Sequence, residues 1–199
     1  MTERHPSRER KKRTPRPPPR PLDRARLQEL ALAYVARFAT TSSKLEGYLS
    51  RKLRERGWND GGADGADSLP DLGEISARFV ELGYIDDEAY ARSRSGGLLR
   101  RGFGPRRVSQ DLYAAGIDEQ IRTDLAPGEA AIRDAALTMA KKRRFGPFAS
   151  EEPDRDRKQK QVAAMLRAGH GFDTVRAIMD APSPAAAEEW AAEAQNEDF

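Results

Sequence analysis

Few residues of this 199-residue chain have the types and spacing that catalysis requires. The chain has no cysteine, which excludes disulfides, thiolate zinc sites and cysteine nucleophiles. Its two histidines, His5 and His170, are too few for a histidine-cluster metal site. Pairs of identical acids occur side by side at 86–87, 151–152 and 188–189. Neighbours on a helix point about 100° apart and do not share a face. We predict no catalytic residue, no metal and no cofactor.

Two other motifs fit structural roles better than chemical ones. Asp86 and Asp87 precede a helical segment, where carboxylates cap the helix and complement its dipole. The segment Gly102-Phe103-Gly104 lacks the Gly-Lys-Ser/Thr ending of a phosphate loop and follows a helix, whereas a phosphate loop follows a strand.

The basic residues indicate a binding function more clearly. Leu49 and Val108 are each expected to point inward from a predicted helix. At 100° per residue, Arg51 and Arg54 then lie on the outer face of the first helix, and Arg106 lies on the outer face of the second. Basic residues also gather at the turns that end other helices, and such corners along an elongated body could follow a nucleic-acid backbone or an acidic groove. The candidate partner-binding residues are Arg51, Arg54, Arg106, Arg107, Lys141, Lys142, Arg143 and Arg144. The alternative is that they are ordinary solvated helix ends, favoured there by the dipole.

The composition indicates a helical protein with charged ends. Val and Ile together number 11 against 30 Ala, and charged residues make up 34% of the chain. Residues 1–21 carry a net charge of +6, residues 183–199 carry −5, and residues 22–182 carry +2. No apolar run approaches the roughly 20 residues that a membrane span needs. Without a secretory signal pattern at the N-terminus, we expect a cytoplasmic protein that does not bind membranes.

Helix start and stop signals recur in the same order three times. Gly57, Gly116 and Gly169 each follow a second helix, four residues after an inward Leu or Met. Asp71, Asp118 and Asp173 stand where they could cap a third helix. Phe-Gly-Pro follows an Arg-Arg pair at 100–105 and again at 143–147. This order predicts an all-α fold of three tandem three-helix repeats that form an elongated, curved array.

The predicted boundaries follow from these signals. We expect a disordered basic Pro-rich arm over 1–21 and a first repeat over 22–83 with a flexible loop at 59–70. The second repeat is expected over 84–127, the third over 128–182, and an acidic Ala-rich tail over 183–199.

Two segments resemble the RecX family of bacterial regulatory proteins. The segment 83–91, Gly-Tyr-Ile-Asp-Asp-Glu-Ala-Tyr-Ala, is similar to the family's Gly-Tyr-Leu/Ile-Asp-Asp-x-x-Phe/Tyr-Ala. The segment 102–117 is similar to the family's Gly-Phe-Gly-Pro turn and the helix that follows it. The matching residues look structural: Gly83, Tyr84, Asp86, Asp87, Gly104, Pro105 and Gly116. The resemblance covers roughly residues 24–180. The loop 59–70, the two charged ends and His170-Gly171 depart from it.

The resemblance implies regulation by binding, without an active site. Family members bind in the groove of the RecA–DNA filament and restrain its assembly, ATP hydrolysis and strand exchange, which affects recombination, DNA repair and the SOS response. We therefore expect RecA filaments as partner, DNA as part of that filament, and a monomeric protein. The alternatives are a direct DNA-binding helical module and a generic helical-repeat adaptor.

Overall fold

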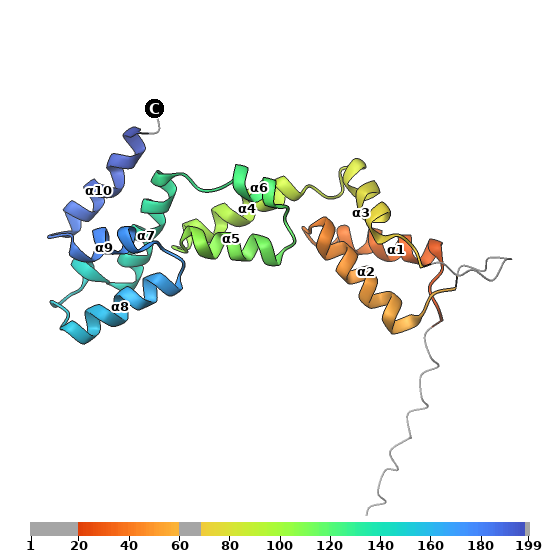
Figure 1. The fold of residues 1–199 in the computed structure, drawn as a ribbon, viewed down its shortest axis with the longest axis horizontal. Coiled ribbons are helices and arrows are strands. Elements are labelled where there is room, and N and C mark those ends of the chain that lie inside the picture. The colour runs from red at the N-terminus through yellow and green to blue at the C-terminus, as the bar shows by residue number, and fades with distance from the viewer. Residues whose placement is uncertain (1–19, 60–68, 198–199) are drawn as a thin grey trace, which may run out of the picture.

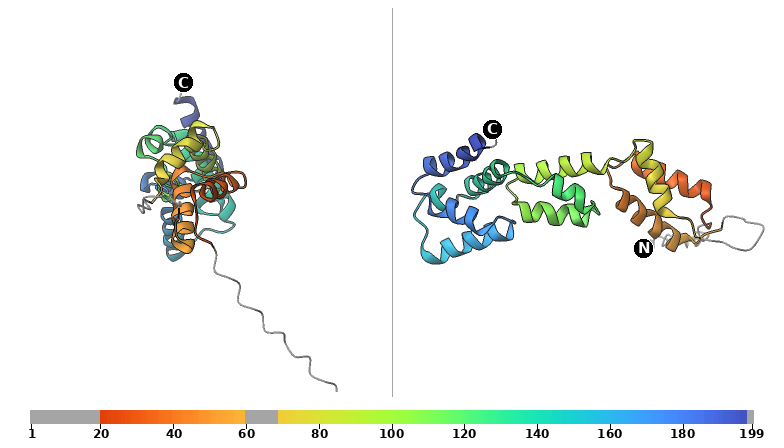
Figure 2. Two further views of the ribbon diagram at one scale, coloured as in Figure 1. Left: turned by 90° about the vertical axis from the view of Figure 1, so that its right-hand side faces the viewer. Right: turned by 45° about the horizontal axis from the view of Figure 1, so that its top comes forward.

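The structure, a computed structural model, describes residues 20–59 and 69–197. Within these ranges it is helical, apart from a two-residue parallel bridge between Leu22 and Trp58. The predicted all-α array of three-helix repeats is confirmed, and the repeats stand in a row along the elongated body (Figures 1 and 2). The arm residues 1–19 and the loop residues 60–68 lie outside the described ranges.

Repeat 1 consists of α1 (Arg24–Val35), α2 (Ser42–Arg56) and α3 (Leu72–Glu81). Its core joins Leu27, Leu45, Leu49 and Phe79, all buried. Leu22 is also fully buried and hydrogen-bonds through its backbone to Gly57 and Asn59. This bridge ties the start of the described chain to the end of α2.

Repeat 2 consists of α4 (Asp87–Arg100), α5 (Pro105–Ala114) and α6 (Glu119–Asp124). Leu98, Val108, Leu112 and Ile117 form its buried core. Local sequence determines the helix starts: Asp86 accepts a hydrogen bond from the Ala89 N–H, and Pro105 occupies the first helical position of α5.

Repeat 3 consists of α7 (Glu129–Arg143), the 3₁₀ turn η1 (Gly146–Phe148), α8 (Arg155–Arg167) and α9 (Phe172–Asp180). A further helix, α10 (Pro184–Glu197), covers the segment expected as an acidic tail. Its Ala187, Ala191 and Ala194 are buried, and it packs mainly on α7. Small side chains on one face allow the two helices to approach closely, so α10 is a docked helix of this repeat.

The capping prediction is correct for two of the three aspartates. Asp71 and Asp118 accept hydrogen bonds from backbone N–H groups in the first turns of α3 and α6. Asp173 does not cap α9, because this helix begins one residue earlier, at Phe172, after Gly171 at the N-cap. Asp173 lies instead inside the first turn, where its charge still complements the helix dipole.

Candidate partner-binding surface

The second helices of the three repeats, α2, α5 and α8, lie along the same side of the elongated body (Figure 1). Repeated contacts between consecutive repeats fix this arrangement. In each contact, the N-terminal end of one repeat's second helix meets the turn after the second helix of the next repeat.

At the first junction, side-chain and backbone groups at the start of α2 make this contact. Thr41 Oγ1 donates to the Ala115 carbonyl oxygen at 2.6 Å, and the Ser42 N–H donates to Asp87 Oδ1 at 3.0 Å. Lys44 donates to the Tyr90 hydroxyl and lies 4.5 Å from the centre of that ring. Asp87 therefore contributes to joining two repeats as well as to starting α4.

At the second junction, backbone atoms make the same contact. The Gly104 N–H donates to the Ala168 carbonyl at 2.9 Å, and the Arg106 N–H donates to the Gly169 carbonyl at 3.1 Å. His170 is fully buried beside them, with Nε2 3.0 Å from the Gly102 carbonyl oxygen. Because a carbonyl can only accept, Nε2 carries the proton in the neutral ring.

Burial lowers the pKa of His170, and the hydrogen bond to Gly102 opposes part of that shift. Its Nδ1 atom has no hydrogen-bond partner within the described part of the chain. The ring is therefore neutral and serves the packing of two repeats. No sequence signal indicates that His170 is buried, because its hydrogen-bond partner Gly102 comes from another repeat.

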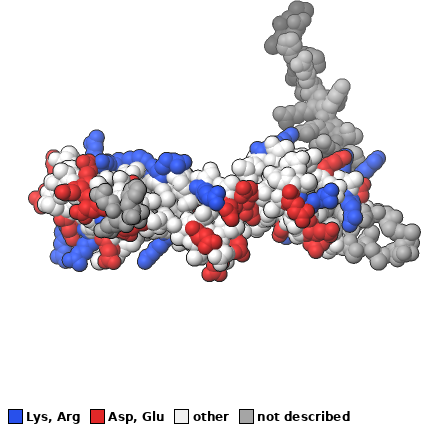
Figure 3. Space-filling view, turned by 90° about the horizontal axis from the view of Figure 1, so that it is seen from above, with Lys and Arg blue, Asp and Glu red and all other residues white. Residues whose placement is uncertain are grey.

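The structure brings six of the eight candidate cations to the second junction. Arg106 and Arg107 begin α5 there, and Lys142 Nζ donates to the Arg100 carbonyl at 3.2 Å, which brings the run 141–144 beside the end of α4. All six side chains are exposed. Lys and Arg side chains gather along one edge of the body over repeat 3 and this junction (Figure 3).

These six cations differ in their partners. Lys141 pairs with Glu188 of α10 at 2.7 Å and lies 5.9 Å from the ring centre of Phe148. Among the described residues, Arg106, Arg107, Arg143 and Arg144 form no ion pair within 4 Å. Arg144 has a left-handed backbone, φ +53°, the region that glycine favours.

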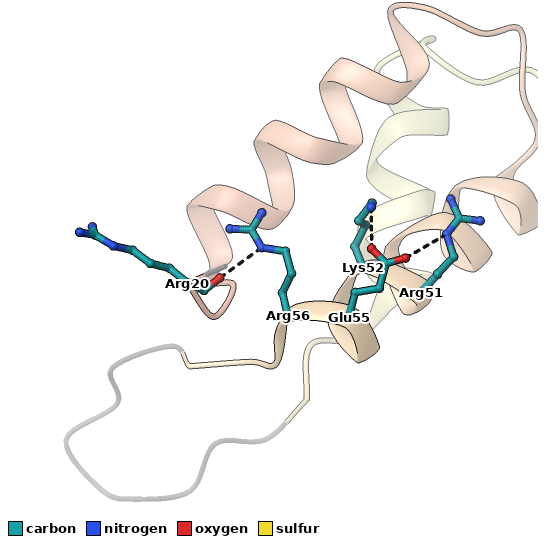
Figure 4. Close-up of polar contacts among 5 residues, drawn as sticks. All are labelled: Arg20, Arg51, Lys52, Glu55 and Arg56. Carbon is teal, nitrogen blue, oxygen red and sulfur yellow. Dashed lines mark hydrogen bonds and ion pairs between the residues drawn. The ribbon is translucent and has the colours of Figure 1, made fainter. Parts of the chain in front are cut away.

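The other two candidates, Arg51 and Arg54, lie on α2 of repeat 1. Figure 4 shows Arg51 beside Glu55. Both arginines are exposed, but Arg51 lies 3.7 Å from Glu55 Oε1 and 5.6 Å from the ring centre of Tyr48. Lys52 donates to Glu55 at 2.6 Å, and this hydrogen bond is the main cause of the lowered pKa of that carboxyl. Arg56 donates to the Arg20 carbonyl at 3.1 Å, so the end of α2 lies against the residue where the described chain begins.

The residues of the two family-like segments hold turns and junctions. Gly83 and Gly116 have positive φ, 73° and 74°, as a left-handed helix end requires. A Cβ on Gly116 would lie 2.2 Å from Ser43, so this turn also needs glycine to admit repeat 1. Tyr84 is half-exposed and packs against Phe79, with 5.7 Å between ring centres.

These features define a class: an all-α protein of tandem helical repeats, in which each repeat contacts its neighbours in a row. Among the described residues, no group of acids and histidines is arranged to hold a metal, and no helix is long and apolar enough to cross a membrane.

The chain belongs to the RecX family of regulatory proteins. Residues 86–124 match the family model for the second three-helix domain of RecX. The regulatory protein RecX of Myxococcus xanthus is 30% identical over 166 residues, which cover 81% of this chain and 88% of the relative. That of a Mycobacterium species (strain JLS) is 31% identical, with 80% of this chain and 84% of the relative covered.

Solved structures agree with the fold. The crystal structure of RecX from Lactobacillus salivarius superposes with a TM-score of 0.60 at 22% identity, covering 78% of this chain and 93% of that one. A second structure, described as regulatory protein RecX, gives a TM-score of 0.56 at 25% identity, with 78% and 73% covered.

Proposed function

We propose that this protein binds RecA recombinase filaments on DNA and restrains their assembly, ATP hydrolysis and strand exchange. It acts in the cytoplasm, by binding and without a catalytic step of its own. Membership of a family of regulatory proteins supports the regulatory role. The link to RecA comes from the resemblance of its motifs at 83–91 and 102–117 to those of this family.

The observation that carries the proposal is the group of exposed cations at the second junction that form no ion pair within 4 Å with other described residues. Arg106, Arg107 and Arg143 extend from a body that is otherwise nearly neutral, since residues 22–182 carry a net charge of only +2. Affinity for DNA alone rises with the number of phosphates neutralised. A nearly neutral body with one local cationic surface is better suited to a partner that offers both acidic protein surface and phosphate.

The direct test measures the ATP hydrolysis of the cognate recombinase, stimulated by single-stranded DNA, while this protein is titrated. We expect inhibition well below one copy per recombinase subunit, because a regulator of filament growth need not coat the filament. No inhibition by correctly folded protein at saturating amounts would contradict the proposal. Equally tight binding to naked duplex DNA, with a steep salt dependence, would instead favour a DNA-binding module.

Charge reversal locates the surface. One variant carries Arg106→Glu, Arg107→Glu, Lys142→Glu and Arg143→Glu. Its matched control reverses Arg26, Arg37, Arg78 and Arg92, which are exposed elsewhere, so both variants have the same net charge. We expect the first variant to lose inhibition and the control to keep it. Equal losses would show that total charge matters and that the junction surface does not.

A further inference from the structure

A groove of 530 Å³ runs along α4 where repeat 1 meets repeat 2. One wall comes from the connector after α1, at Ala39 and Thr40, together with Tyr84. The floor and the other wall come from α4 itself. The groove therefore belongs to two repeats, and anything bound in it would contact both.

The floor of the groove consists of small side chains. Ala89, Ser93 and Gly97 recur every four residues along α4 and so share one face of the helix. A Cβ on Gly97 would meet no atom within 4 Å, so the space above it is open. Such a floor allows a bound chain to approach the helix closely. The aromatic and arginine side chains beside it are the types enriched at the energetic centres of protein interfaces.

Two residues that line the groove, Thr40 and Arg101, have side chains without a hydrogen-bond or ion-pair partner in the part of the chain that the structure describes. Thr40 is 5% exposed, and its hydroxyl has no hydrogen-bond partner in the described part of the chain. Buried hydroxyl groups usually have one, so this atom is an exception that requires explanation. Arg101, at the C-terminal end of the groove, is exposed and lies 5.1 Å from the Phe103 ring centre, but has no carboxylate partner among the described residues.

The charges in the groove indicate which kind of partner fits. Arg94 is already held by Asp111 through two hydrogen bonds of 2.5 and 2.8 Å, which lower the pKa of that carboxyl. Asp86 lies at the N-terminal end, so one end is acidic and the other basic. A run of phosphates would be repelled at Asp86, whereas a peptide segment with one carboxylate toward Arg101 and none near Asp86 is compatible with both ends.

We propose that this groove docks a peptide segment of a recombinase subunit, with an apolar side chain over Gly97 and a single carboxylate against Arg101. The inference rests on the function proposed above and adds to it a contact site separate from the cationic junction. A partner in the groove would bridge repeats 1 and 2 and hold them at one angle.

The test obstructs the groove without removing any contact. Gly97→Leu places a side chain in the open space over the floor, in the middle of a helix where leucine is preferred to glycine. Gly47→Leu is the matched control, because Gly47 is also helical and free of atoms within 4 Å of a Cβ. Gly47 is exposed, and Gly97 is half-buried. The measurement is the concentration that half-inhibits recombinase ATP hydrolysis on single-stranded DNA.

We expect Gly97→Leu to raise the half-inhibiting concentration about tenfold or more, the scale of an obstructed interface centre. Gly47→Leu should behave as the unsubstituted protein. Arg101→Gln should cause a smaller loss that fades with added salt, while Arg92→Gln, an exposed α4 position outside the groove, should cause none. If Gly97→Leu does not fold, Ser93→Leu obstructs the same floor from an exposed position.

Each other outcome overturns the inference in a recognisable way. Full inhibition by correctly folded groove variants would remove the groove from recombinase binding and leave the proposed function intact. No inhibition by the unsubstituted protein would contradict both the role of the groove and the proposed function. An equal effect of Gly97→Leu on binding to DNA alone would identify phosphate as the occupant, and an effect on self-association would identify a second copy of the chain.

Discussion

The backbone N–H of Gly104 and the carbonyl oxygen of Ala168, 2.9 Å apart, join repeat 2 to repeat 3. At the preceding junction, the hydroxyl of Thr41 and the carbonyl of Ala115 play the same part. The second junction is closer, because backbone meets backbone: a Cβ on Gly104 would lie 2.4 Å from the backbone of Gly169 and His170.

Replacing Gly104 with alanine should therefore damage the second junction. The added methyl group cannot fit without moving the turn after α8, at a cost of about 1–3 kcal/mol in the free energy of unfolding. Urea denaturation measures this loss. Gly47→Ala is the control: it has open space and should stabilise its helix by about 0.5–1 kcal/mol. Equal stability of the two variants would contradict the close packing.

The free energy of unfolding should fall as the pH drops below 6.5, the ordinary pKa of histidine. The folded-state pKa of His170 is lowered from 6.5 by burial, so the unfolded chain binds the proton more readily. Its contribution is fully present above pH 6.5 and is lost as the pH falls toward the folded-state pKa.

Denaturation of His170→Gln between pH 5 and 7.5 tests this account. Glutamine can still donate to the Gly102 carbonyl but does not titrate, so the dependence of stability on pH should become flatter over this range. An unchanged pH dependence in the variant would assign the effect to other groups.

Arg144→Gly separates stability from binding. Arg144 has φ +53°, a conformation that costs most residues about 1 kcal/mol relative to glycine. The variant should unfold at a higher urea concentration yet inhibit recombinase more weakly, because one exposed cation is lost. Arg144→Lys keeps the charge and serves as the control. Stronger stability with unchanged inhibition would remove Arg144 from the partner-binding surface.

Ending the chain after Ser183 should destabilise repeat 3. The deletion removes the buried face of α10, formed by Ala187, Ala191 and Ala194, and the contact of Arg133 with Trp190, 4.8 Å from the ring centre. The loss should be about 1.5–3 kcal/mol, the scale of one large buried side chain. Glu188→Gln, which breaks only the pair with Lys141, should cost less than about 1 kcal/mol. A deletion without thermal effect would mean that α10 is not needed for folding.

Local signals were sufficient for most helices. Asp71 and Asp118 cap their helices as expected, because a cap is satisfied by N–H groups two or three residues away. The prediction that Asp173 caps α9 was wrong for a local reason too, because Gly171 is also an acceptable N-cap and the helix begins directly after it, at Phe172. The acidic segment 183–199 showed no strong apolar stripe, and alanines alone did not reveal that α10 would dock on α7.

The sequence by itself determined the fold class, the order of the repeats and the residues that begin and end most helices, because these depend on contacts within a few residues. Only the tertiary structure decided that His170 is buried, that Lys142 reaches the Arg100 carbonyl and that a groove forms beside Thr40. Each of these three features depends on contacts between two repeats. The distances between their partners along the chain, 68 residues for His170 and Gly102, exceed the range of any helical periodicity.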